Sequence, residues 1–108
     1  MTDTQLYEIV GSFEVGFAEG HDSKDELAGA FIYCFCRSAN LQTATKLMFE
    51  ALAEDHYEIK DIEFISFFHS LELDADDYEY FAEMFGELTG NQVEYSEFNS
   101  YSTDERLN

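Results

Sequence analysis

Apolar and polar side chains alternate over residues 7–17, and this period of two constrains the fold most strongly. A β-strand sends successive side chains to opposite faces, so alternation of this kind indicates a strand with one buried face. The apolar parity holds Tyr7, Ile9, Gly11, Phe13, Val15 and Phe17, and the other holds Glu8, Ser12 and Glu14. We therefore expect the chain to begin with a half-buried strand.

A second strand is predicted over Ala30–Cys36, where both parities are apolar. A strand of that composition is covered on both faces, which places it inside a sheet. The polar residues 19–26 carry turn formers without periodicity and are expected to join the two strands as a loop. Cys34 and Cys36 lie two apart, where a mutual disulfide would strain the backbone. We interpret them as reduced, buried thiols.

After Arg37 the hydrophobic period becomes helical. Leu41, Ala44, Leu47, Met48, Ala51 and Leu52 share one face at this spacing. Ser38 and Asn40 are both available as the N-cap, and we expect the helix to end near Asp55.

A third strand is predicted over Tyr57–Ile65, which mixes β-branched and aromatic residues with charges. Its parity slips near Asp61, which indicates a bulge. A last strand is expected over Gln92–Tyr101.

Between these strands, Asp74 is predicted to cap a second helix, with Asp77 at the third helical position. Gly90 is expected to end it. The apolar stripe of this helix comprises Tyr78, Phe81, Ala82, Phe85 and Leu88.

The predicted order is β-β-α-β-α-β in one α+β domain over residues 1–101, followed by a frayed tail at 102–108. We expect a ferredoxin-like sandwich: an antiparallel or mixed four-stranded sheet with two helices on one face. A right-handed crossover through the first helix would allow the second and third strands to pair in parallel.

An all-helical alternative rests on two segments that resemble the second half of a calcium-binding EF-hand loop and end at Glu63 and Glu97. Such a loop needs oxygen ligands at positions 1, 3 and 5 and a glycine at position 6. Both segments fail this test, so calcium binding by this route is not expected.

No residue is assigned to catalysis, to a metal or to a cofactor. Helix capping explains Asp74, Asp76 and Asp77 without a metal, and the three histidines lack zinc-binding spacing. The chain has no Gly-x-Ser-x-Gly, no phosphate-binding glycine loop and no His-Glu-x-x-His. We expect a protein that is not an enzyme.

Charge limits the partners. The chain has 24 acidic and 5 basic residues and a net charge of −19. Such a field repels phosphate backbones and anionic lipid, so we expect no direct binding of nucleic acid or membrane and a basic protein as the partner. Without a signal peptide or an apolar segment of membrane length, the chain is expected to be soluble and cytoplasmic, as a monomer or homodimer.

The candidate partner-binding residues fall in two groups. Asp76, Glu79, Glu83 and Glu87 recur along one edge of the second helix, where repulsion between like charges opposes folding and no folding requirement asks for them. The second group is Tyr95, Phe98 and Tyr101, aromatic residues of the last strand that are suited to anchoring an interface. A solvated face that serves only solubility explains the acidic edge equally well.

Three segments carry a resemblance to a known family. Residues 38–41, 51–59 and 93–101, with the run Val93-Glu94-Tyr95-Ser96-Glu97-Phe98, look like the regulator of ribonuclease E activity B family. That family has a glycine where this chain has His56, and a tryptophan near its end that this chain lacks. The resemblance implies a ferredoxin-like fold and a non-enzymatic inhibitor of a nucleic-acid enzyme.

By composition the chain is also similar to DNA-mimic proteins, including anti-restriction and anti-CRISPR inhibitors, and to toxin-immunity proteins. We therefore expect an acidic inhibitor or regulator that occupies the nucleic-acid-facing surface of a nucleic-acid-binding enzyme or a toxin. An immunity protein and an acidic housekeeping domain are the alternatives.

Overall fold

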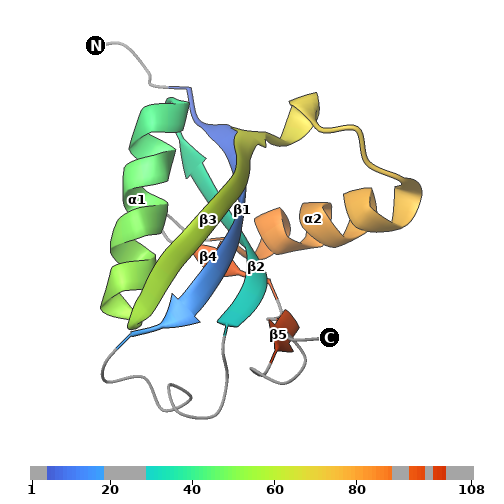
Figure 1. Cartoon of the computed structure of the whole chain (residues 1–108). Coiled ribbons are helices and arrows are strands. Elements are labelled where there is room, and N and C mark those ends of the chain that lie inside the picture. Colours follow the sequence, from blue (N-terminus) through green and yellow to red (C-terminus); the bar gives the residue numbers. More distant parts are fainter. Residues whose placement is uncertain (1–4, 19–28, 89–92, 97–98, 102–108) are drawn as a thin grey trace.

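The computed structural model describes residues 5–18, 29–88, 93–96 and 99–101. They form one antiparallel sheet with strands in the order β3-β1-β2-β4 and two α-helices (Figure 1). The elements are β1 (Tyr7–Phe17), β2 (Gly29–Ser38), α1 (Leu41–Glu54), β3 (Tyr57–Phe67), the 3₁₀ turn η1 (Phe68–Ser70), α2 (Ala75–Glu87), β4 (Glu94–Tyr95) and β5 (Asn99–Tyr101). The predicted α+β class and four-stranded antiparallel sheet are confirmed.

β1 lies at the centre of the sheet and pairs antiparallel with both β2 and β3. Strands β2 and β3 therefore run in the same direction with β1 between them, so β2, α1 and β3 form a split β-α-β unit, the motif of ferredoxin-like folds. The parallel pairing of β2 with β3 that a crossover through α1 would allow is replaced by the pairing of each strand with β1.

The two helices cover opposite faces of the sheet (Figure 1). On one face, Ile9 and Phe13 share a core with Met48 and Leu52 of α1, and on the other Phe35 packs in the core that contains Phe81 and Phe85 of α2. The expectation of both helices on one face is corrected. The reason lies in β2, because a strand that is apolar on both parities needs cover on both faces.

Both helix N-termini are capped by side chains. The Asn40 Oδ1 accepts a hydrogen bond of 2.8 Å from the Thr43 amide, which decides between the two candidate caps of α1. Ser38 instead ends β2, and its buried hydroxyl has no hydrogen-bond partner among the described residues. At α2 the Asp77 amide donates to Oδ1 of Asp74 at 2.8 Å, as predicted.

The irregularity predicted near Asp61 is present on both sides of it. The pairing of β1 with β3 shifts register twice, which leaves Lys60 and Glu63 as the extra residues of β3. A bulge of this kind redirects side chains, and the second one brings Glu63 to the face of the sheet that carries Ser12.

The last predicted strand is two short strands, β4 and β5, which pair with different parts of β2. Phe98, Gly90 and the tail at 102–108 lie outside the described residues.

Candidate interaction surface

The acidic edge of α2 is exposed along its whole length. Asp76, Glu79, Glu83 and Glu87 are all exposed, whereas Phe81 and Phe85 of the same helix are buried against the sheet. The structure therefore brings together the first group of predicted residues as one outward edge.

α2 and its N-cap have the linear charge density of a nucleic-acid strand. Six carboxylates, at Asp74, Asp76, Asp77, Glu79, Glu83 and Glu87, occupy a segment that contains no lysine or arginine. The segment is about 21 Å long, which gives about one carboxylate per 3.5 Å. A strand of duplex DNA carries one phosphate per roughly 3.4 Å of its axis.

Arg37 of β2 fixes the position of α2. Its Nη2 donates to the Phe85 carbonyl at 2.6 Å and pairs with the Glu8 carboxylate at 3.2 Å, and its Nη1 lies 3.5 Å from the Leu88 carbonyl. A cation at a helix C-terminus satisfies free carbonyls and favours the helix dipole. Arg37 was not among the predicted site residues, although a lone arginine at the end of an apolar strand was a signal for it.

α2 covers only part of its face of the sheet. The remaining part holds a hollow of about 270 Å³, lined by Ser12, Phe31, Ile32, Tyr33 and Glu63. The Ser12 hydroxyl donates a hydrogen bond of 2.6 Å to Oε1 of Glu63, which holds this carboxylate at the hollow. None of these residues was predicted as a site residue, because a bulge in β3 places Glu63 there.

Tyr33 links this hollow to α2. Its ring packs edge-on against Phe81 at 4.9 Å between centroids. Burial raises the pKa of the Tyr33 phenol, and the nearby carboxylates of Asp77 and Glu63 raise it further. The N-terminal turn of α2 and the hollow therefore belong to one acidic surface.

Tyr95 lies on the other side of the sheet. It packs against the core beneath α1, and the centroid of its ring lies 6.4 Å from that of Tyr57. Its hydroxyl donates a hydrogen bond to the Asp55 carboxylate. The structure therefore does not bring Tyr95 together with the acidic edge of α2. Tyr101 pairs through its backbone with Gly29, its side chain is outside the described set, and so is Phe98.

Cys34 and Cys36 are free and buried, as expected. Burial raises the pKa of Cys36 to about 11 and that of Cys34 still higher, so neither thiol is a nucleophile at neutral pH. Within the described ranges, no three His, Cys, Asp or Glu side chains lie together as a metal site would require.

No protein-family model, curated protein or solved structure matches this chain. Neither helix in the described part has the length and apolar character needed to cross a membrane.

Proposed function

We propose that this protein is a non-enzymatic acidic binding protein that inhibits or regulates a basic, nucleic-acid-processing protein by occupying its nucleic-acid-facing surface. The observation that carries the proposal is the exposed run of six carboxylates on α2, with the charge spacing of a nucleic-acid strand. A partner whose surface binds the phosphates of a nucleic acid would find a similar row of negative charges along α2.

The position of α2 supports the same function. The helix is held by its buried phenylalanines and by Arg37, so the carboxylates are presented on a fixed element. A preorganised charged surface speeds encounter with a partner of opposite charge and costs little ordering on binding. Regulation of a ribonuclease falls within this proposal, and immunity to a toxin is the alternative.

The experiment compares two variants that each lose two charges. Glu79→Gln/Glu83→Gln removes an i,i+4 pair from the acidic edge, and Glu50→Gln/Glu54→Gln removes an exposed i,i+4 pair from α1, across the sheet. Both have the same net charge. Each immobilised protein captures partners from a lysate of the source cells at about 0.05 and 0.5 M salt, and retained proteins are identified by mass spectrometry.

We expect the parent and the α1 variant to retain the same basic nucleic-acid-binding protein at low salt, and duplex DNA or RNA to displace it. The α2 variant should bind it at least fivefold more weakly, because it loses charges at the contact. Equal binding by the two variants would show that only total charge matters, and the proposal would fail. Retention of partners that nucleic acid does not displace would also contradict it.

A further inference from the structure

The hollow beside α2 combines a carboxylate with aromatic walls, and its lining residues come from β1, β2 and β3. Its lining includes the Glu63 carboxylate, the Ser12 hydroxyl and the rings of Phe31 and Tyr33. Phe31 is 39% exposed, so part of an aromatic ring is open to solvent at this place. Such a lining selects for a ligand that is both cationic and flat.

The hollow is built on rigid elements. Ser12 is in the central strand β1. The backbone of Tyr33 makes two hydrogen bonds with Ser96: the Tyr33 amide donates to the Ser96 Oγ at 2.8 Å, and the Ser96 amide donates to the Tyr33 carbonyl at 2.9 Å. Ser96 itself is buried. The walls are therefore fixed before a ligand arrives, which reduces the cost of binding.

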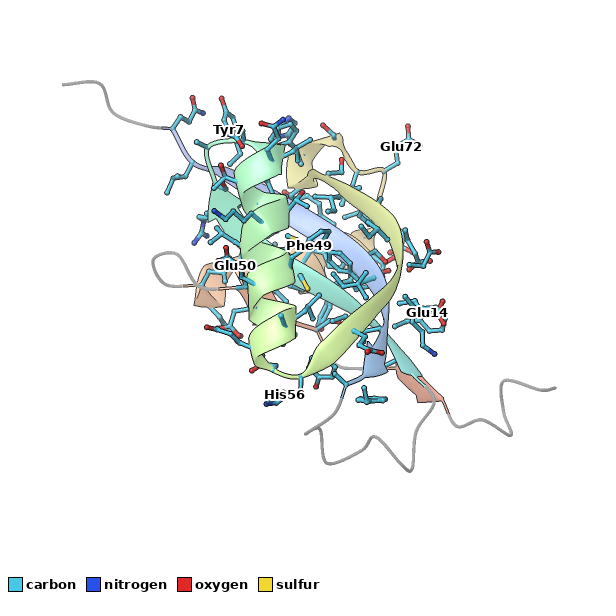
Figure 2. The ribbon with its side chains drawn as sticks, turned by 60° about the vertical axis from the view of Figure 1, so that its left-hand side comes forward. Tyr7, Glu14, Phe49, Glu50, His56 and Glu72 are labelled. Carbon is cyan, nitrogen blue, oxygen red and sulfur yellow. The ribbon has the colours of Figure 1, made fainter. Side chains whose placement is uncertain are left out.

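Carboxylates predominate around the hollow, although the side chain of Lys60 lies over Gly16 on the same face of β1. Glu14 follows Ser12 by two residues on the same face of β1, and its cross-strand partner is Asp61. Figure 2 shows Glu14 on the side of β1 away from α1, the side on which the hollow lies. Together with Asp77 of α2, these carboxylates create a potential that favours a cation at the hollow.

We propose that this hollow is the docking site for an arginine side chain of the protein partner. The inference rests on the proposed function, since it requires a basic partner. The guanidinium would donate hydrogen bonds to the free lone pairs of Glu63 and lie against the aromatic rings, a combination that suits arginine better than lysine. Its volume, below the 300–1,000 Å³ of pockets for drug-sized ligands, fits one side chain.

A metal ion is a poorer occupant. The described residues offer no group of three metal-ligating side chains, and two of the lining residues are aromatic. A phosphate or carboxylate ligand would be repelled by Glu63 and its acidic neighbours. The chemistry of the lining therefore selects an organic cation.

The test uses N-acetyl-arginine amide as the probe, titrated into the full-length ¹⁵N-labelled protein and followed by NMR. We expect saturable shifts at the amides of Ser12, Tyr33 and Glu63. N-acetyl-citrulline amide, a neutral probe of nearly the same shape, should cause shifts at least fivefold smaller, and N-acetyl-lysine amide should bind at least threefold more weakly.

The decisive variant is Glu63→Gln, which keeps an oxygen to accept the Ser12 hydrogen bond and removes only the charge. It should bind the arginine probe at least fivefold more weakly than the parent, whereas Glu54→Gln, on α1 across the sheet, should bind it as the parent does. Equal binding of arginine and citrulline probes, or loss of arginine binding in Glu54→Gln alone, would overturn the inference. Failure here leaves the capture experiment on α2 unaffected, because that experiment does not change the hollow.

Discussion

The hydroxyl of Tyr95 donates a hydrogen bond of 2.9 Å to Oδ2 of Asp55, the residue that ends α1. Forty positions separate the two residues, so this bond connects the short strand β4 to the C-terminus of the helix on the same face of the sheet. Burial is the main cause that raises the pKa of Tyr95, and the hydrogen bond to Asp55 and the charge of that carboxylate raise it further. Tyr95 thus has a structural role in addition to the partner-binding role that its sequence position suggests.

Replacing Tyr95 by Phe should lower the free energy of unfolding by about 1 kcal/mol, since it removes one hydrogen bond to a charged acceptor that is open to solvent. Urea denaturation of both proteins measures this loss. The control is Tyr78→Phe, because Tyr78 is 58% exposed. That change should shift stability by less than about 0.5 kcal/mol. Equal stability of parent and Tyr95→Phe would show that the bond contributes nothing in solution.

The two candidate caps of α1 give a second prediction. Asn40→Ala removes the side-chain oxygen that accepts from Thr43, and such a change costs about 1 kcal/mol of stability. Ser38→Ala removes a buried hydroxyl that has no hydrogen-bond partner in the described part of the chain, so the variant should be as stable as the parent or more stable. Thermal unfolding of the two variants measures both effects. A larger loss from Ser38→Ala would mean that its hydroxyl has a partner in solution.

The local elements were predictable because each carries its own period. The alternation over residues 7–17 gave the bounds of β1, and Asp74 with Asp77 marked the start of α2. The arrangement of the helices was predicted wrongly, with both on one face, although the composition of β2 argued against it: a strand apolar on both parities requires cover on each face. Periodicity indicates which face of an element is buried, but it does not indicate which other element covers that face.

The acidic edge of α2 was predictable for the same reason, since helical spacing alone places its four residues together. The hollow was not, because it depends on a bulge and on the register between β1 and β3. Glu63 reaches Ser12 only after the register shifts, and their separation of 51 positions gives no local signal. Tyr78 shows the reverse failure: its spacing predicts burial, yet it stacks on Phe68 at the surface.

His56 supplies a third prediction through its backbone. It has a φ of 65°, in the left-handed region, and lies at the C-terminal end of α1 (Figure 2). Hydrogen bonds from Ala18 to its carbonyl, at 2.8 Å, and from its own amide to Ala53, at 3.1 Å, hold it there. A side chain in this conformation costs energy that glycine avoids.

His56→Gly should therefore raise the free energy of unfolding by about 0.5–1 kcal/mol. His56→Ala is the control, and it should not stabilise, since alanine has the same backbone restriction as histidine. If both variants gained equally in urea denaturation, the loss of the imidazole and not the backbone would be the cause.

The buried thiols predict how stability depends on pH. In the folded protein burial raises the pKa of Cys36 to about 11 and that of Cys34 beyond it, whereas thiols of the unfolded chain ionise near 8.5 to 9. Above that pH the unfolded state loses protons that the folded state keeps, so the free energy of unfolding must fall as pH rises. The full contribution is present below about pH 8.5 and is lost progressively toward pH 11.

For each thiol the slope rises with pH toward a limit of about 1.4 kcal/mol per pH unit, so the decline should be steeper between pH 8.5 and 9.5 than between pH 7.5 and 8.5. Urea denaturation at these three pH values under reducing conditions measures it. This range ends below the pKa of about 10 at which tyrosines of the unfolded chain are half ionised. Cys34→Ala/Cys36→Ala is the matched variant: it should be less stable than the parent at pH 7.5, because it loses buried apolar volume, but its stability should change little up to pH 9.5. Parallel pH profiles for the two proteins would show that groups other than these thiols cause the decline.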